Sequence, residues 1–333
     1  ARDKSFSGAV EQLDNQYSAL DLLTPIADRD QLHPYFLELI ERPGRAPARK
    51  IFEEIGPWLY PADNHFIREF QCHQFDQRLW ELYLWASFRE MGFDVAQREA
   101  PDFECINPVY EINFTVEATT TSPSQGGVLL EHPNPSTPDE HQEFLQNYMP
   151  MKFGSALSSK LQKVDEHQKP YWEREHSKGK PFLLALADFH KPADHTKHEL
   201  GSMTYSQGAL FIYLYGRRVD WWVDNGELKM VAVAVEQHEY KGKVIPSGFF
   251  DLPDAENISG VLFSNAGTLA KFDRMGVCAG FGAPKHKYFR AGFRFNPDPN
   301  AVVGDYFFEE VGQDGYEETW CDELQLFHNP NAK

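Results

Sequence analysis

The stretch KPFLLALADFH, residues 180–190, constrains the fold of this 333-residue chain more than any other feature. Its apolar residues run almost without interruption, whereas a strand with one solvated face alternates apolar and polar residues. A short continuous run is typical of a central strand that is covered on both faces. The sequence therefore predicts an α/β fold, with a mixed central sheet flanked by helices.

Two helices are predicted to flank this sheet. Residues 75–95 repeat their apolar side chains at three- and four-residue spacing, and Gly92 is expected to end that helix. Residues 153–172 show a second apolar stripe, which is limited by Pro170. Residues 204–216 fit either a helix or a strand, so the sequence leaves that element open.

An alternating segment, residues 109–119 with the sequence VYEINFTVEAT, predicts a strand with two unlike faces. Tyr110 and Ala118 fall on its apolar face, and Glu117 falls on its polar face. The Ser-, Pro- and Gly-rich residues 121–140 that follow predict a long loop, and loops of this length are often functional.

These elements divide the chain into three regions. Residues 1–65 are predicted to form a helical N-terminal segment, and residues 66–216 are predicted to form the core that contains the sheet. Residues 217–333 are β-rich in pattern, because short runs of strand-forming residues are bounded there by Gly, Pro and Asn. The sequence leaves open whether this last region is a separate domain or completes the core sheet.

The formal net charge of −18 at pH 7 argues against a protein that binds nucleic acid through a large basic surface. Contact with phosphates would then need a local basic patch, a bridging metal ion or a partner protein that supplies positive charge. Residues 280–295 are the most basic stretch, and they interleave basic and aromatic side chains as some nucleic-acid-contacting strands do. An ordinary exposed hairpin accounts for them equally well.

Membrane insertion and secretion are not expected. No stretch of about eighteen apolar residues is present, and the four cysteines lie far apart without a CxxC pair. Free thiols of this kind are typical of the reducing cytoplasm, which is the expected location. His190, His195 and His198 have a spacing that can bind zinc, but a polar loop is the better interpretation.

The order of parts around the alternating strand resembles the PD-(D/E)xK nuclease superfamily. Glu81 lies in the first predicted helix, a Pro-Asp pair with Asp102 starts a strand, and Glu117 ends the next strand. The resemblance covers residues 75–190, and it implies a restriction-endonuclease-like core that hydrolyses phosphodiester bonds with Mg²⁺ or Mn²⁺. DNA is the expected substrate rather than RNA, because most members of the superfamily cut DNA.

The resemblance assigns the metal to Asp102 and Glu117, with the carbonyl of Ala118 as a third ligand and Glu81 as an assisting acid. Elementary chemistry agrees, since Mg²⁺ prefers oxygen ligands and usually binds one or two carboxylates together with waters and substrate phosphate. The metal would lower the pKa of a water molecule and offset the charge that develops on the phosphate. Each acid also has an ordinary explanation, as a turn residue, a solvated strand end or a surface ion pair.

One position departs from the superfamily pattern. The lysine expected two residues after Glu117 is replaced by Thr119, which carries no charge. In this superfamily the following helix can supply the lysine instead, and Lys160 lies beside the apolar stripe of that helix. Lys163 is the second candidate, although it is predicted to point toward solvent.

Two other functions remain open. A nuclease fold that has lost its activity would serve as an interaction or scaffold module, and the net charge and the missing lysine favour it. A glycosidase would use a pair of carboxylates without added metal, and the abundant Trp and Tyr would suit stacking on sugars. The sequence is compatible with an oligomer and does not determine its order.

Overall fold

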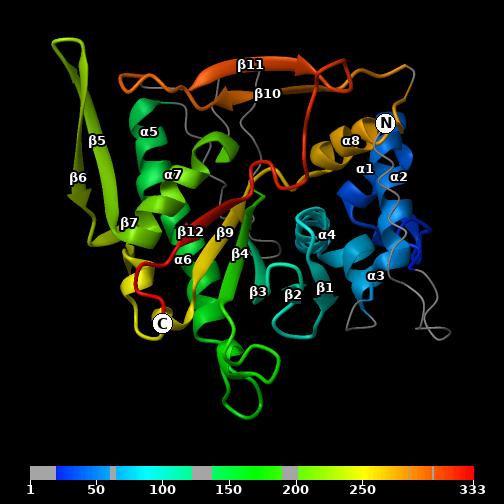
Figure 1. Cartoon of the computed structure of the whole chain (residues 1–333), viewed down its shortest axis with the longest axis horizontal. Coiled ribbons are helices and arrows are strands. Elements are labelled where there is room, and N and C mark those ends of the chain that lie inside the picture. Colours follow the sequence, from blue (N-terminus) through cyan, green and yellow to red (C-terminus); the bar gives the residue numbers. More distant parts are fainter. Residues whose placement is uncertain (1–19, 61–64, 122–136, 190–201, 284, 302–303) are drawn as a thin grey trace.

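A six-stranded sheet runs through the molecule in the order β1-β2-β3-β4-β9-β12 (Figure 1). The computed structural model describes residues 20–60, 65–121, 137–189, 202–283, 285–301 and 304–333. The strands are β1 (Asp94–Gln97), β2 (Phe103–Asn107), β3 (Ile112–Thr121), β4 (Phe182–Asp188), β9 (Gly260–Ser264) and β12 (Gln325–His328). β4 is parallel to both β3 and β9, and the outer pairs are antiparallel. The mixed sheet predicted from the sequence is therefore confirmed.

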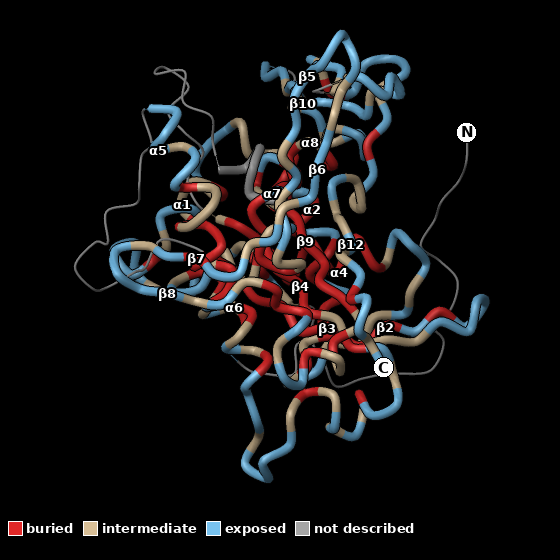
Figure 2. Tube along the Cα trace, turned by 90° about the vertical axis from the view of Figure 1, so that its left-hand side faces the viewer, coloured by how far each residue is buried: buried red, intermediate tan, exposed pale blue. Residues whose placement is uncertain are grey.

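Helices cover both faces of the sheet, which confirms the predicted α/β architecture. α4 (Phe75–Glu90) packs on one face, and Trp80 Nε1 donates a hydrogen bond of 3.1 Å to the carbonyl of Ala185 in β4. α6 (Met149–Leu161) and α7 (Ser202–Tyr215) pack on the other face, so β4 is buried on both sides. Most buried residues lie in the sheet and these helices (Figure 2). Other α-helices of the described residues are α1 (Pro34–Glu41), α2 (Ala46–Ile55), α3 (Phe66–Arg68), α5 (Pro138–Glu143) and α8 (Leu269–Cys278).

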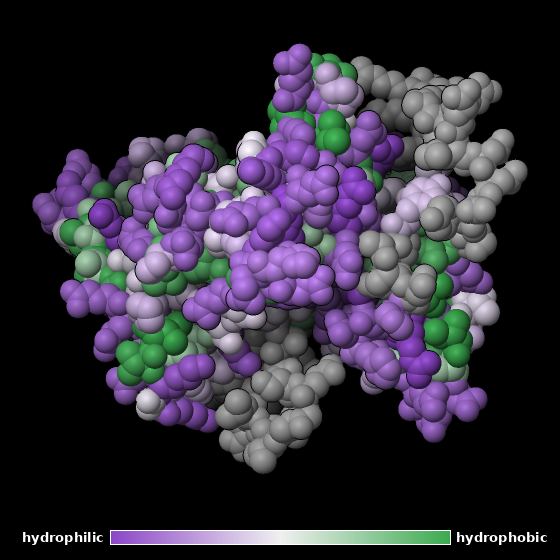
Figure 3. Space-filling view, turned by 90° about the horizontal axis from the view of Figure 1, so that it is seen from below, coloured by the Kyte–Doolittle hydropathy of each residue, from purple (hydrophilic) through white to green (hydrophobic). Residues whose placement is uncertain are grey.

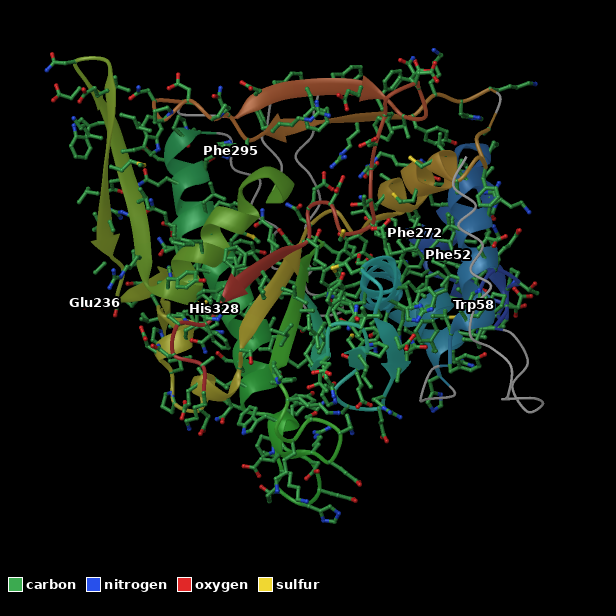
Figure 4. All side chains as sticks on the ribbon, viewed as in Figure 1. Phe52, Trp58, Glu236, Phe272, Phe295 and His328 are labelled. Carbon is green, nitrogen blue, oxygen red and sulfur yellow. The ribbon has the colours of Figure 1, made fainter. Side chains whose placement is uncertain are left out.

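Helices from the two ends of the chain share one core. Phe52 of α2 stacks on Phe272 of α8 with ring centroids 4.7 Å apart, and the two side chains point toward each other in Figure 4. Both rings are buried, and they belong to the same apolar cluster as Trp80 of α4. The N-terminal helices are therefore packed against a helix that is more than 200 residues away in the sequence.

The last third of the chain contributes both to the core sheet and to hairpins outside it. β9 and β12 extend the sheet beyond β4, whereas three antiparallel pairs form separate two-stranded sheets. These pairs are β5 (Arg217–Asp224) with β6 (Glu227–Ala234), β7 (Gln237–Tyr240) with β8 (Lys243–Pro246), and β10 (Phe289–Arg294) with β11 (Asp305–Glu310). In Figure 1 the β5–β6 and β10–β11 hairpins stand at the left and top margins of the molecule.

The prediction of a single strand over residues 109–119 is wrong at its start. Asn107 Oδ1 accepts hydrogen bonds from the N–H groups of Val109 (3.0 Å) and Tyr110 (3.1 Å), and this side-chain turn reverses the chain. Tyr110 is 73% exposed instead of lying on an apolar face. The alternation continued through the turn by chance, so the pattern placed the start of the strand too early. The strand also runs two residues past the predicted end, to Thr121.

The predicted helix over residues 153–172 is wrong at both ends. α6 starts before residue 153 and ends at Leu161. Asp165 Oδ1 accepts hydrogen bonds from the N–H groups of His167 (2.8 Å) and Lys169 (2.9 Å). Such local bonds from an aspartate satisfy the backbone outside a helix, so a turn forms where the pattern predicted helix.

Glycines end two of the helices. Gly92 follows α4 with a φ of 85°, as the sequence predicts, although the helix itself stops at Glu90. Gly216 follows α7 with a φ of 62°. The ambiguous segment 204–216 therefore belongs mainly to a helix, which packs on the apolar β4.

Parts of two predicted loops lie outside the described residues, namely 122–136 and the histidine group at 190–198. The loop predicted to reach residue 140 is shorter, because α5 begins at Pro138. Thr137 caps this helix by accepting a hydrogen bond of 3.2 Å from the N–H of Glu140.

Candidate functional site

Asp102 lies where the pairing between β2 and β3 stops. The ladder ends with Phe103 opposite Val116, and beyond it the Oδ2 atom of Asp102 accepts the N–H of Ala118 at 2.7 Å. The side chain of Asp102 thus takes the place of the next backbone pair in the ladder. It joins β3 at Ala118, the residue after Glu117. The two acids predicted from the Pro-Asp motif and the strand end are brought to the same point of the sheet.

Glu117 is buried in β3, with 3% of its surface exposed. Its Oε1 atom accepts hydrogen bonds from Lys160 Nζ at 2.5 Å and from the hydroxyl of Tyr171 at 2.7 Å. Its Oε2 atom is also buried, but it has no hydrogen-bond partner. One half of the carboxylate is therefore fixed by two donors, and the other half is left unsatisfied.

Lys160 reaches this carboxylate from the last turn of α6. Thr119 lies two residues after Glu117, where the resemblance predicts a lysine, and it is buried in the same strand. Lys163 follows the end of α6, where it is exposed and lies 5.8 Å from the ring centroid of Tyr171. It lines the same cavity, so the expectation that it points only toward solvent is incomplete.

Glu81 enters the site from α4. It is buried, and its two carboxylate oxygens accept hydrogen bonds from Arg78 Nη1 (2.7 Å) and Gln77 Nε2 (3.0 Å) of the same helix. Burial raises the pKa of Glu81, and the charge of Arg78 opposes that shift without cancelling it. The carboxylate of Glu81 is thus held by two side chains of its own helix. It lines the site together with Asp102 and Glu117.

One cavity of about 330 Å³ is lined by Glu81, Asp102, Glu117, Lys160 and Lys163. Its charged lining includes five acids and four basic residues, which gives a formal net charge of −1 when all of them are ionised. The acids are Glu69, Glu81, Glu99, Asp102 and Glu117, and the basic residues are Arg78, Arg98, Lys160 and Lys163. The cavity is therefore nearly neutral in a chain of net charge −18, and a divalent cation would make it positive. Hydrophilic residues cover much of the face seen in Figure 3.

The carboxylates of the cavity repel each other. Burial raises the pKa of Asp102 most, and the negative charges of Glu117 and Glu81 raise it further. The N–H of Ala118 and the charge of Lys160 oppose this shift, but the pKa of Asp102 stays well above its ordinary value. A bound cation would reverse this balance, because it favours the ionised forms of the acids around it.

The fit to a metal ion rests on two carboxylates. Among the residues that the structure describes, no group of three or more His, Cys, Asp or Glu side chains is arranged to hold a metal ion. The remaining candidates are Asp102 and Glu117, and the Oε2 of Glu117 is a buried oxygen without a donor. Mg²⁺ is compatible with such a site, because it commonly binds one or two carboxylates and keeps several waters.

Tyr171 is the residue of this site that the sequence did not reveal. It is buried in a short 3₁₀ helix (Tyr171–Glu173), and Arg174 lies over its ring at 4.4 Å from the centroid. Burial, followed by the charge of Glu117, raises the pKa of the Tyr171 hydroxyl, so it stays a hydrogen-bond donor at neutral pH. No sequence pattern around Tyr171 indicates a functional role. The residue reaches Glu117 only because the chain turns back after α6 and places the 3₁₀ helix against β3.

Three of the four Lys and Arg side chains in the basic stretch 280–295 are paired with acids. Lys287 contacts Glu310 at 2.9 Å, Arg294 contacts Glu309 at 2.7 Å, and Arg290 contacts acids of the segment 318–323. These pairs reduce the positive charge available to a phosphate. The stretch therefore lends little support to a separate nucleic-acid surface.

No protein-family model, curated protein or solved structure matches this chain. Within the described part of the chain, no helix has the length and apolar character needed to cross a membrane.

Proposed function

We propose that the chain is a Mg²⁺-dependent nuclease that hydrolyses phosphodiester bonds, with DNA as the preferred substrate. The observation that carries this proposal is the buried, unpartnered Oε2 of Glu117 in a cavity shared with Asp102. A buried carboxylate oxygen without a donor is unfavourable, and a divalent cation would compensate it. The order of α4, β1, β2, β3, α6 and β4 supports a restriction-endonuclease-like core.

Asp102 and Glu117 would hold the cation, with the carbonyl of Ala118 and waters as further ligands. When bound, Mg²⁺ supplies a Lewis acid for the phosphate and a water of lowered pKa. Glu81 assists from the side, because its charge adds to the attraction for the cation while Arg78 and Gln77 keep it in place.

Lys160 replaces the lysine that is missing at Thr119. Its ammonium group is fixed against Glu117 Oε1 and belongs to the lining of the cavity. From there it holds the metal-binding carboxylate in one orientation and places positive charge where negative charge grows during phosphodiester hydrolysis. The nearly neutral lining also weakens the objection raised by the net charge, because little of the charge of −18 lies in the cavity.

Replacing Lys160 with methionine is expected to lower metal-dependent cleavage by about 10²–10³-fold, the usual loss when one charge-stabilising group is removed. The assay compares plasmid, linear and single-stranded DNA and RNA in Mg²⁺, Mn²⁺ or EDTA. Mn²⁺ binding should persist in this variant, because the lost hydrogen bond to Glu117 Oε1 is offset by the removal of a positive charge that competes with the cation. The matched control is Lys163→Met, which removes a cavity-lining lysine that has no contact with Glu117 and should keep most of the activity.

Two results would contradict this assignment. Cleavage that survives Lys160→Met but not Lys163→Met would move the role to the second lysine. An absence of cleavage by the folded wild-type chain on all four substrates, together with an absence of Mn²⁺ binding, would refute the nuclease proposal.

Replacing Tyr171 with phenylalanine should weaken Mn²⁺ binding by about 10–100-fold, the usual effect of losing a hydrogen bond to a metal-binding side chain. The ring and its packing are kept, but Glu117 Oε1 loses one of its two donors. Isothermal titration calorimetry measures the affinity. Tyr213→Phe is the control, since that buried tyrosine lies on α7 and its hydroxyl contacts Ser158 at 3.5 Å. Equal affinities of the two variants would show that Tyr171 does not position Glu117.

The second candidate function is an inactive nuclease-fold module that acts through binding a partner, including a protein that supplies positive charge. The uncharged Thr119 at the lysine position favours it. This function predicts that Glu117 variants change stability but no catalytic rate.

A further inference from the structure

The β5–β6 hairpin has one face that is almost entirely apolar. Its strands are joined by a tight turn in which Asn225 (φ 51°) and Gly226 (φ 82°) both have positive φ, as hairpin turns of the I′ type require. Trp221 is directly opposite Met230, and opposite residues of an antiparallel pair share a face. The residues of this apolar face are Val219, Trp221, Val223, Leu228, Met230, Ala232 and Ala234.

This apolar face is open to solvent. Trp221 is 55% exposed and Met230 is 64% exposed, and the hairpin stands at the left margin of the molecule in Figure 1 and is mostly exposed or intermediate in Figure 2. A two-stranded hairpin without further cover is at best marginally stable in water. The open apolar area is about 500 Å², near the upper end of the largest patch on a typical monomer.

The charges of the hairpin indicate which occupant this face suits. The ionic side chains Arg218, Asp220 and Lys229 lie on the opposite face, and Asp224 and Glu227 lie beside the turn on that same side. Arg217, at the base, is the one charged residue that shares the apolar face. A second chain can therefore approach this face without bringing acids together, although each chain carries a net charge of −18.

An anionic lipid surface is a poorer match for the same face. Membrane-surface binding is helped by clusters of Lys and Arg, and a chain of this net charge would be repelled. A basic partner is a poor match as well, because the apolar face offers it no carboxylate. With these two partners excluded, the occupant that suits the face is an uncharged apolar surface, such as the same face of another copy of this chain.

We propose that the apolar face of the β5–β6 hairpin packs against the same face of a second copy of this chain. A two-fold contact of this kind is self-complementary, so the Trp221 side of each hairpin lies on the Met230 side of the other. Aromatic rings and methionine sulfur make favourable contacts. The two faces together would bury about 1,000 Å², which is the lower limit for a specific interface.

The test is the oligomeric state of the full chain by sedimentation equilibrium over a range of concentrations. The wild type is expected to form a dimer, and Trp221→Thr is expected to raise its dissociation constant at least tenfold. Trp222→Thr is the matched control, because Trp222 is 50% exposed but lies on the other face. It should change the dissociation constant less than twofold. Threonine preserves strand propensity in both variants.

A second measurement on the wild type avoids any effect of mutation on folding. Hydrogen exchange of the β5 and β6 amides should slow as the protein concentration rises, whereas exchange in β10 and β11 should not. A monomer at every concentration would overturn the proposal, as would equal weakening by the two tryptophan variants. Nuclease activity is not a readout here, so the result stands whether or not the proposed function is correct.

Discussion

Replacing Glu117 with glutamine is expected to reduce metal-dependent phosphodiester cleavage by at least about a hundredfold, and to weaken Mn²⁺ binding in parallel. The glutamine side chain keeps the shape of the glutamate, but its amide nitrogen cannot bind a cation. Glu117 Oε2 is a buried oxygen that lacks a donor within the protein, so the variant removes a carboxylate oxygen that is free to bind a cation. Initial cleavage rates and calorimetric titration with Mn²⁺ measure the two effects.

Glu104→Gln is the matched control for this variant. Glu104 is also buried, lies on the neighbouring strand β2, and is paired with Arg98 (2.6 Å) and Lys180 (2.5 Å), but its side chain is not part of the cavity lining. Its loss should lower the free energy of unfolding and leave cleavage per folded molecule within a few-fold of the wild type. Unchanged cleavage by Glu117→Gln would rule out the proposed metal site.

Glu117→Gln should also be stable in the absence of metal. The variant loses the ion pair with Lys160, but it also loses the repulsion that Glu117 exerts on Asp102 and Glu81. Urea unfolding in EDTA should therefore show a smaller loss of stability for Glu117→Gln than for Glu104→Gln. This difference separates a functional carboxylate from a structural one.

The largest expected effect on stability is that of Glu318→Gln, which should lower the free energy of unfolding by about 3–5 kcal/mol. The Glu318 side chain is fully buried and binds Lys271 Nζ at 2.7 Å, Arg274 Nη2 at 3.0 Å and the Tyr316 hydroxyl at 2.5 Å. Its neutralisation leaves the buried ammonium of Lys271 without its counter-charge. Urea denaturation at pH 7 measures the loss.

The pH dependence of stability gives a second check on Glu318. Burial raises its pKa, but the hydrogen bonds and charges of Arg274 and Lys271 outweigh burial and lower the pKa to about 2. A carboxyl group whose pKa is lowered by folding stabilises the protein fully above its ordinary pKa of 4.5, and that contribution is lost as the pH falls toward about 2. The stability difference between wild type and Glu318→Gln should therefore shrink below pH 4.5.

Glu323→Gln is the control for Glu318. It lies in the same segment and pairs with Arg290 at 2.8 Å, but its side chain is 38% exposed. Exposed ion pairs contribute little, so this variant should cost about 1 kcal/mol or less. Equal losses from the two variants would mean that burial of the Glu318 cluster does not determine its contribution.

The candidate site was predictable in part, and the limit has a physical cause. Asp102, Glu117 and Glu81 were selected because each lies at a defined place on a predicted element, and the structure groups them around one cavity. The choice of Lys160 over Lys163 depended on a helical pattern that continues past the true end of α6. Lys160 contacts Glu117 because it is still inside the helix, whereas Lys163 lies beyond it.

The sequence by itself determined the local elements whose apolar periodicity is strong, namely α4, the core of α6 and the buried strand β4. Their patterns arise from contacts over one or two turns or across a single strand, so a short window contains the signal. These elements predicted the α/β class, and their order along the chain predicted where Glu81, Asp102 and Glu117 lie. The open face of the β5–β6 hairpin is likewise encoded locally, by its alternation and its Asn-Gly turn.

Only the tertiary structure decided which distant segments meet. β9 pairs with β4 although more than 70 residues separate them, Phe272 of α8 stacks on Phe52 of α2, and Tyr171 donates to Glu117 across the return of the chain. The choice of such partners depends on the shape of the whole core and on where turns such as that at Asp165 redirect the backbone. No short window of the sequence contains that information, because burial and pairing between distant segments are properties of the assembled fold.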